Sequence, residues 1–195
     1  MLAAVILSGG ASSRMGSPKA LLPYQGRPFL EHLLDITVHP KIGVRRVVLG
    51  AHAEPISKSV TLPAGEIVVN DQWETGQLSS IQAAIRSLPA GTDGLLLCLI
   101  DHPLISAALV SQLIAAFYTD KTKIALPVYE GRRGHPVIFP TGLYDELLQA
   151  PLDKGARAVV WAHAEGITEM PTEEEGCVLN LNDPKTLLRA TGEPD

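Results

Sequence analysis

A loop rich in glycine and serine, from Ser8 to Lys19, carries residue types that bind phosphate. Small residues such as Gly9 and Gly10 let backbone N–H groups approach an anion, and successive N–H groups form a concave site for phosphate oxygens. Arg14 and Lys19 place two positive charges on the same loop, where arginine suits a forked contact with phosphate and lysine a point contact. The loop therefore predicts a phosphate site, with an ordinary surface loop as the alternative.

Two common nucleotide-binding motifs are absent from this loop. It does not match G-x-x-x-x-G-K-[ST], because Lys19 follows Pro18 and precedes Ala20, and it lacks G-x-G-x-x-G, because Gly9 and Gly10 are adjacent. A P-loop ATPase and a dehydrogenase with a dinucleotide-binding fold are therefore both disfavoured. The chain also shows no G-x-S-x-G or H-E-x-x-H motif, so nothing points to a serine hydrolase or a zinc protease.

Length and composition indicate a globular protein. The chain has 195 residues, 46% hydrophobic residues and a net charge of −5, and we expect a single domain over residues 1–195. The acidic balance argues against nucleic-acid binding, and apolar runs such as Leu95–Ile100 are too short to span a membrane. Cys98 and Cys177 form no disulfide or metal pattern, and the apolar start is typical of a buried strand rather than a secretory signal. We therefore expect a cytoplasmic protein.

Short apolar runs alternate with longer amphipathic segments up to residue 128. This alternation predicts an α/β protein with a three-layer, doubly wound, mostly parallel sheet and right-handed crossovers. Ser106 is a candidate N-cap for the third helix. The predicted strands are Ala3–Leu7, Arg46–Leu49, Glu66–Val69, Leu95–Ile100 and Lys123–Val128, and the predicted helices are Pro28–Val38, Gln77–Leu88 and Ser106–Tyr118.

The pattern changes after residue 128. Val128–Phe139 predicts two strands joined by a turn bounded by glycine, a small β-hairpin insertion. Helices are expected over Gly142–Ala150 and Lys154–His163, and a solvated acidic turn over Glu173–Gly176. Leu179–Pro184 is expected to end a strand and open a last helix with proline at its first position.

The chain topology brings an acidic residue toward the phosphate loop. Ligands of open parallel sheets bind beyond the carboxyl ends of the strands, and both the loop and Asp101 directly follow predicted strands. From the residues alone, Asp101 is predicted to be a helix cap or a turn residue before Pro103.

A series of motifs runs in one order from residue 2 to about residue 188. Together they resemble the MobA-like nucleotidyltransferases, which attach a CMP or GMP unit to molybdopterin, and most closely the cytidylyltransferase branch. The motifs are Leu7-Ser8-Gly9-Gly10, Arg14-Met15-Gly16, Pro18-Lys19, Leu21-Leu22-Pro23, Asn70–Ser80, Ile100–Leu104, Gly131–Phe139, Asp153–Arg157 and Asn180–Pro184.

The resemblance implies a Rossmann-like nucleotidyltransferase fold and transfer of CMP from CTP to the terminal phosphate of molybdopterin, with release of pyrophosphate. The acceptor phosphate is largely dianionic at neutral pH, so the reaction needs no protein general base. The implied catalytic residues are Arg14, Lys19 and Asp101. The implied nucleotide-binding residues are Leu7, Ser8, Gly9, Gly10, Arg14, Lys19, Asn70, Gly76, Ser79, Ser80 and Asp101.

The resemblance also implies a metal site and an acceptor site. Asp101 would bind Mg²⁺, with Asn182 or Asp183 as the second ligand. The acceptor would meet Arg132, Arg133 and His135. Docking to a molybdoenzyme that receives the product is a further expected partnership.

The nucleotide is narrowly predicted to be CTP, with GTP as the alternative. Gly10 after Gly9 and the pair Asn180 and Asn182 resemble guanylyltransferases, whereas the motifs at 18–19, 134–136 and 155–157 resemble cytidylyltransferases. Two other functions stay open. One is nucleotidyl transfer to a sugar phosphate or a cobinamide phosphate, and the other is non-catalytic nucleotide binding as a partner of a molybdoenzyme.

Overall fold

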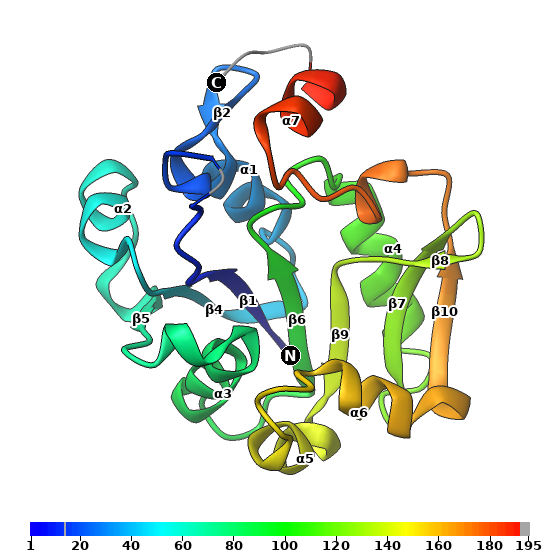
Figure 1. The fold of residues 1–195 in the computed structure, drawn as a ribbon. Helices are drawn as coiled ribbons and strands as arrows, with labels where there is room; N and C mark the ends of the chain where they lie inside the picture. The colour runs from blue at the N-terminus through cyan, green and yellow to red at the C-terminus, as the bar shows by residue number, and fades with distance from the viewer. Residues whose placement is uncertain (14, 192–195) are drawn as a thin grey trace.

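A twisted, mostly parallel sheet forms the centre of the computed structural model, which describes residues 1–13 and 15–191 (Figure 1). Its order is β10-β7-β9-β6-β1-β4-β5, with β8 paired to β7 outside that order. Strand β9 is antiparallel to β6 and β7, whereas the other neighbours in this order are parallel. The strands are β1 (Leu2–Ser8), β4 (Ile42–Leu49), β5 (Ile67–Val69), β6 (Gly94–Leu99), β7 (Ile124–Tyr129), β8 (Arg132–Arg133), β9 (Val137–Pro140) and β10 (Ile167–Pro171).

Helices pack on both faces of this sheet. One face packs against α1 (Phe29–Ile36), α2 (Ala53–Ser59) and α4 (Ala107–Phe117). The opposite face packs against α3 (Gln77–Ser87), α5 (Tyr144–Gln149) and α6 (Arg157–Ala162). The predicted three-layer α/β fold is therefore confirmed.

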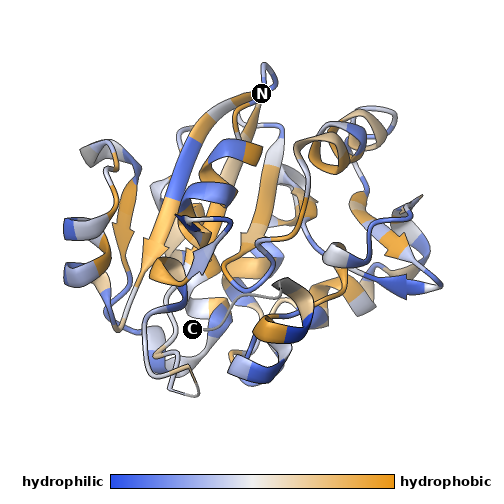
Figure 2. Cartoon of the chain, turned by 90° about the horizontal axis from the view of Figure 1, so that it is seen from above, coloured by the Kyte–Doolittle hydropathy of each residue, from blue (hydrophilic) through white to orange (hydrophobic). Residues whose placement is uncertain are grey.

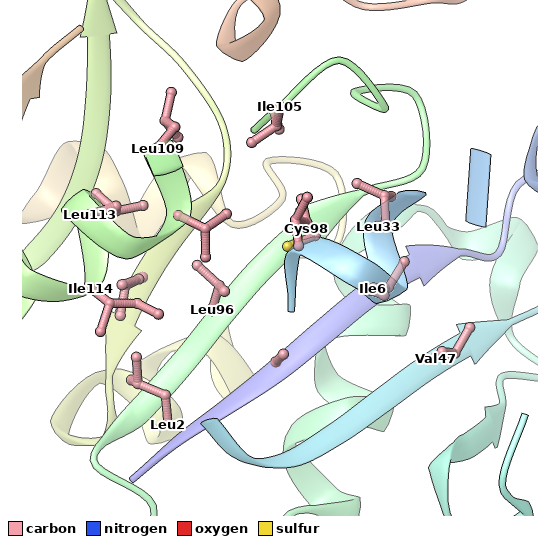
Figure 3. Packing of buried hydrophobic residues seen from close by; sticks show 14 of the residues in the cluster. Leu2, Ile6, Leu33, Val47, Leu96, Cys98, Ile105, Leu109, Leu113 and Ile114 are labelled. Atoms are coloured by element: carbon pink, nitrogen blue, oxygen red, sulfur yellow. The ribbon is translucent and has the colours of Figure 1, made fainter. Parts of the chain in front are cut away.

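Alternation along the central strands explains the two packed layers. In β1, Leu2 and Ile6 point to the α1/α4 layer, while Val5 and Leu7 point to the α3 layer. Figure 3 shows Leu96 and Cys98 of β6 on the same side as Leu109 and Leu113 of α4. Cys98 is fully buried, and burial raises the pKa of its thiol to about 12, which keeps it a neutral core group.

Hydrophobic residues concentrate on the strands and on the inward sides of the helices (Figure 2). Among the described residues, no helix is both long and apolar enough to cross a membrane.

Several local predictions are confirmed. The Ser106 hydroxyl accepts a hydrogen bond from Leu109 N at 3.0 Å, so it caps α4. Pro184 is the first residue of α7 (Pro184–Thr191). The acidic turn was expected to be solvated, but it is only partly so. The Glu174 carboxylate accepts hydrogen bonds from the backbone N–H of Ser106, at 3.1 Å, and from the Ser106 hydroxyl.

Other elements differ from the prediction. Helix α2, strand β10 and a short hairpin of β2 (Pro23–Tyr24) and β3 (Arg27–Pro28) were not expected. Residues 179–182 form no strand, because this segment crosses the end of the sheet rather than lying along an edge. Leu181 N instead donates to Asp101 O at 2.8 Å.

The hairpin predicted over Val128–Phe139 is present, but its second half consists of two short strands, β8 and β9. Strands β7 and β8 pair through a tight turn in which Glu130 and Gly131 have positive φ. The chain then bends over residues 134–136, and β9 enters the main sheet between β7 and β6. The bend lets Gly134 lie against Cys177, where a Cβ atom on Gly134 would come within 2.5 Å of the Cys177 carbonyl oxygen.

A small third core ties the C-terminal segment to the loop after β1. It contains Met15, Leu22, Phe29, Leu181 and Leu187, all buried. Figure 1 accordingly shows α7 at the same end of the molecule as β2. This packing brings Asn182 next to the predicted phosphate loop.

Candidate functional site

A cleft of about 340 Å³ lies beyond the carboxyl ends of β1 and β6, and we call it the first cleft. It joins the phosphate loop to the turn that follows β6, as expected for an open parallel sheet. The predicted nucleotide-binding residues that line it are Leu7, Ser8, Gly9, Gly10, Lys19, Gly76, Ser80 and Asp101. Arg14, the other predicted catalytic residue, lies outside the described residues.

Opposite charges meet at one side of the first cleft. Lys19 Nζ donates a hydrogen bond to Asn182 Oδ1 at 2.5 Å and lies 3.8 Å from Asp101 Oδ2. The side chains of Lys19 and Asp101 are only 14% and 20% exposed, so their interaction is less screened than that of a surface pair. This places an ammonium group and a carboxylate where a polyphosphate and its metal ion could both bind.

Close backbone packing fixes the phosphate loop. A Cβ atom on Gly9 would lie 2.9 Å from Ser80 Oγ, and one on Gly50 would lie 2.3 Å from the Gly9 carbonyl oxygen. Ala51 N donates to that same oxygen at 3.1 Å. Lys19 N donates to Ser12 Oγ at 3.2 Å, which closes the far end of the loop. The loop is thus held from both sides.

Asn70 and Ser79 support the first cleft from behind and are not among the residues that line it. The buried Asn70 amide donates to Ser79 Oγ at 2.8 Å and to Ser80 Oγ at 3.0 Å, and its oxygen accepts from Gln72 N at 3.0 Å. The motif at 70–80 therefore forms one hydrogen-bonded unit. Within it, Gly76 and Ser80 line the cleft.

The donor set of the first cleft fits a hard divalent cation. Asp101 offers a carboxylate of the kind that Mg²⁺ prefers, and the Asn182 amide oxygen, which accepts from Lys19 Nζ, has a second lone pair to offer. Asp183 is occupied elsewhere, since its carboxylate accepts from Thr186 N at 2.9 Å and from Thr186 Oγ1 at 3.0 Å at the start of α7. No group of three or more His, Cys, Asp or Glu in the described ranges could hold a metal, so water and substrate phosphates would complete the coordination.

A second, larger cleft of about 680 Å³ adjoins the first, and Gln77 lines both. The floor of this second cleft is apolar, and its rim carries Arg133, Lys154 and Arg157. Trp161 stands on the rim at 64% exposure, with the Arg157 guanidinium 6.0 Å from its ring centroid. The apolar floor is built from Leu78, Leu97, Leu126, Val137, Phe139 and Val160.

Two of the three predicted acceptor residues line the second cleft. His135 lies in its wall, and Arg133 lies on its rim, where Arg133 Nε also pairs with Glu169 Oε1 at 2.7 Å. Arg132 is exposed and lines neither cleft. The three residues therefore do not form one group.

Sequence reasoning assigned no role to several cleft residues. Trp73, Glu74 and Gln77 line the first cleft, and Lys154 and Arg157 the second. All of them fall inside motifs quoted above, at 70–80 and 153–157. Each motif as a whole therefore predicts the lining of the clefts better than the single residues selected from it.

The chain matches a known protein family. The MobA-like NTP transferase domain matches residues 4–166. Since that is most of the chain, the protein belongs to this family and is a nucleotidyltransferase.

Two relatives bear different names. The chain is 31% identical to a molybdenum cofactor guanylyltransferase of Rhizobium meliloti (strain 1021), with 96% of this chain and 89% of that protein covered. It is 32% identical to the nicotine blue oxidoreductase of Paenarthrobacter nicotinovorans, with 71% of each covered.

The fold also has counterparts among solved structures. Rv0371c from Mycobacterium tuberculosis H37Rv superposes with a TM-score of 0.83 at 27% identity, covering 98% of this chain and 97% of that chain. A structure of Rv0371c complexed with manganese superposes with a TM-score of 0.78 at 23% identity, covering 98% of each chain.

Proposed function

We propose that the protein transfers a nucleotidyl group from CTP to the terminal phosphate of molybdopterin and releases pyrophosphate. The observation that carries this proposal is the first cleft, where Lys19 and Asp101 face each other, 3.8 Å apart, beside Gly9 and Gly10. The adjoining second cleft has room for an acceptor and a basic rim that suits a phosphate. We also propose that residues 1–195 form one domain, which the packing of Leu181 and Leu187 against Phe29 supports.

The first cleft would hold the triphosphate. The Gly9 and Gly10 amides and the Lys19 ammonium would bind the β- and γ-phosphates, the part that leaves as pyrophosphate. Lys19 is held by Asn182 before any nucleotide arrives. A charge held in place in this way need not reorganise when negative charge shifts toward the leaving group.

Asp101 and Asn182 would hold a divalent cation together with the nucleotide phosphates. A bound Mg²⁺ would supply charge neutralisation at the transferring phosphate. The Asp101 turn is fixed because its carbonyl oxygen accepts from Leu181 N at 2.8 Å, and this contact also sets the distance between Asp101 and the Asn182 segment.

The transfer itself would require alignment rather than base catalysis. An oxygen of the acceptor phosphate would attack the α-phosphorus, a new P–O bond would form, and the bond to the β-phosphate oxygen would break. Because the attacking phosphate is largely dianionic at neutral pH, no side chain needs to remove a proton. Gln77 lies where the two clefts meet, beside the expected path of this attack.

GTP is the second candidate nucleotide. The motifs at 18–19, 134–136 and 155–157 favour CTP. The relative from Rhizobium meliloti is named a guanylyltransferase, which favours GTP. Both nucleotides would use the same phosphate contacts.

The test is pyrophosphate release with CTP, GTP, ATP and UTP, each with and without molybdopterin, in Mg²⁺ or Mn²⁺. We expect release that depends on metal and on molybdopterin and is fastest with CTP. Faster pyrophosphate release with GTP would instead identify the protein as a guanylyltransferase. Tight nucleotide binding without release under any condition, or reduction of nicotine blue in place of release, would contradict the proposal.

A further inference from the structure

A histidine outside both clefts contacts the backbone of the phosphate loop. The Nε2 atom of the half-buried His52 lies 2.8 Å from the carbonyl oxygen of Ala11. A carbonyl oxygen only accepts hydrogen bonds, so Nε2 carries the proton in this contact and donates it. His52 lies in the turn between β4 and α2, next to Ala51, whose N–H donates to the Gly9 carbonyl oxygen at 3.1 Å. This turn therefore holds two carbonyl groups of the loop, while His52 itself lines neither cleft.

These two contacts orient the N–H groups of the loop. In a trans peptide the C=O of one residue and the N–H of the next point in opposite directions. With the carbonyl groups of Gly9 and Ala11 turned toward the β4–α2 turn, the N–H groups of Gly10 and Ser12 point away from it. Neither N–H donates to another group in the part of the chain that the structure describes, and both residues line the first cleft. The contact of His52 with Ala11 thus leaves the Ser12 N–H available to an anion.

Ser12 has a backbone conformation that a side chain disfavours. Its φ is +51°, in the left-handed region that residues other than glycine seldom adopt. Rotating the peptide between Ala11 and Ser12 by half a turn would return this φ to the negative range. The same rotation would exchange the two ends of the peptide, so that a carbonyl oxygen replaced the N–H and repelled a phosphate. The hydrogen bond from His52 opposes this rotation.

We propose that His52 is a positioning residue for nucleotide binding, and that it fixes the peptide between Ala11 and Ser12 with the N–H toward the phosphates. This inference rests on the proposed function, because it takes the first cleft to bind the triphosphate. Without the His52 contact, part of the protein would have the rotated peptide, and the apparent dissociation constant would rise by the inverse of the competent fraction. Bound phosphate would restore the peptide, so the loss falls on affinity rather than on kcat.

Three substitutions of His52 separate the hydrogen bond from packing. His52→Phe keeps a ring and removes the donor, His52→Gln places an N–H near the Nε2 position, and His52→Asn places one only near the Nδ1 position. The His52 side chain does not cap α2, so none of the three removes a cap. His52→Phe and His52→Asn should raise the nucleotide KM about five- to tenfold, the scale of one lost hydrogen bond, with kcat and the acceptor KM unchanged. His52→Gln should restore most of the nucleotide affinity.

The matched control is His32→Phe. The Nε2 atom of His32 lies 2.6 Å from the carbonyl oxygen of Tyr24, which is the same kind of contact, and His32 lines neither cleft. Its loss should leave the nucleotide KM unchanged. Thermal unfolding of every variant monitors the fold.

A double-mutant cycle with Ser12→Gly tests the peptide rotation itself. Glycine adopts a positive φ without penalty, so the preference for the rotated form is weaker in this background. His52→Phe should therefore raise the nucleotide KM by a smaller factor in Ser12→Gly than in the wild type. Equal factors in the two backgrounds would overturn the inference, because they would show that His52 does not act through this peptide.

Binding without turnover shows which part of the nucleotide is affected. Trp73 lines the first cleft and is the only tryptophan in a Trp161→Phe background, so its fluorescence can follow CTP, GTP and inorganic pyrophosphate in Mg²⁺. In His52→Phe the three dissociation constants should rise together. Dissociation constants equal to those of the wild type would overturn the inference. A loss in His52→Gln as large as in His52→Phe would also overturn it and make His52 a packing residue.

The inference and the proposed function fail on different measurements. A wild-type protein that binds pyrophosphate but releases none from any nucleotide would overturn the proposed function, and the binding comparison of the His52 variants would still decide the inference. A wild-type protein that binds neither CTP, GTP nor pyrophosphate would overturn both.

Discussion

The two clefts of this molecule are built on different physical principles. In the first, Lys19 already contacts both Asn182 and Asp101, so the charges are held by the protein. In the second, which has twice the volume, the floor is apolar. Neither Lys154 nor Arg157 on its rim forms an ion pair within the described residues.

This difference matches two separate tasks. A site for nucleotidyl transfer stabilises the transition state with charges that are already in place, so small displacements of its side chains lower the rate strongly. A site that only binds an acceptor gains affinity from apolar burial and from several weak polar contacts. Substitutions in the first cleft should therefore change turnover strongly, whereas those in the second should change mainly the acceptor KM.

Asp101→Asn should have the largest effect. It removes the carboxylate opposite Lys19 while keeping the shape of the side chain. We expect metal-dependent pyrophosphate release to fall by about 10³-fold or more, the scale of losing a preorganised charge at a reacting group. The matched control is Glu74→Gln, which neutralises an exposed carboxylate of the same cleft. It should lower pyrophosphate release by less than about threefold. Retained activity in Asp101→Asn would leave Asp101 with only its role in the turn.

Lys19→Ala should follow, with kcat/KM for the nucleotide reduced by about 10²-fold. The ammonium contacts both Asn182 and Asp101, so its loss removes the fixed positive charge that faces the triphosphate. Lys19→Arg keeps the charge but spreads it over a planar group, and it should recover only part of the activity. Steady-state kinetics with varied nucleotide at saturating acceptor gives kcat/KM for both variants. Identical kinetics for wild type and Lys19→Ala would exclude Lys19 from the site.

Gly50→Ala tests how closely the first cleft is built. The new methyl group would lie 2.3 Å from the Gly9 carbonyl oxygen and 2.7 Å from Trp73 Cβ, so the phosphate loop or Trp73 must move. We expect unfolding free energy to fall by about 1–3 kcal/mol and kcat/KM for the nucleotide to fall by about 10-fold. Gly142→Ala is the matched control, because a Cβ atom there meets nothing within 4 Å. Denaturant unfolding and kinetics that do not distinguish the two variants would show that the loop tolerates displacement.

The first cleft was predictable from sequence because its main parts follow strand ends. The phosphate loop follows β1, and Asp101 follows the apolar run of β6, so the parallel topology brings them together. The contact of Lys19 with Asn182 spans 163 residues and depends on the third core, in which Leu181 packs near Met15. Local sequence pattern carries no information on such a contact.

The second cleft was less predictable for the same reason. Its lining comes from α3, β6, β7, the 133–139 segment and residues 152–161, which no single motif spans. The sequence analysis also missed short helices and strands in which apolar and polar residues follow no clear period. Helix α2 contains Pro55 in its first turn, and β10 is a five-residue edge strand that ends in Pro171. Both are stabilised by tertiary packing rather than by local propensity.

Arg157→Ala should have the smallest effect and should separate the clefts most clearly. Arg157 opens α6, where a positive charge is unfavourable to the helix dipole, so its removal should not lower the Tm. Its guanidinium lies over Trp161 at the rim of the second cleft and is exposed, so losing one phosphate contact should raise the acceptor KM about fivefold, the scale of one solvent-screened charge pair. The nucleotide KM should not change. Arg86→Ala, an exposed arginine of α3 outside both clefts, should leave both KM values unchanged. If Arg157→Ala instead raised the nucleotide KM, the basic rim would belong to the triphosphate, and the division of labour between the clefts would be wrong.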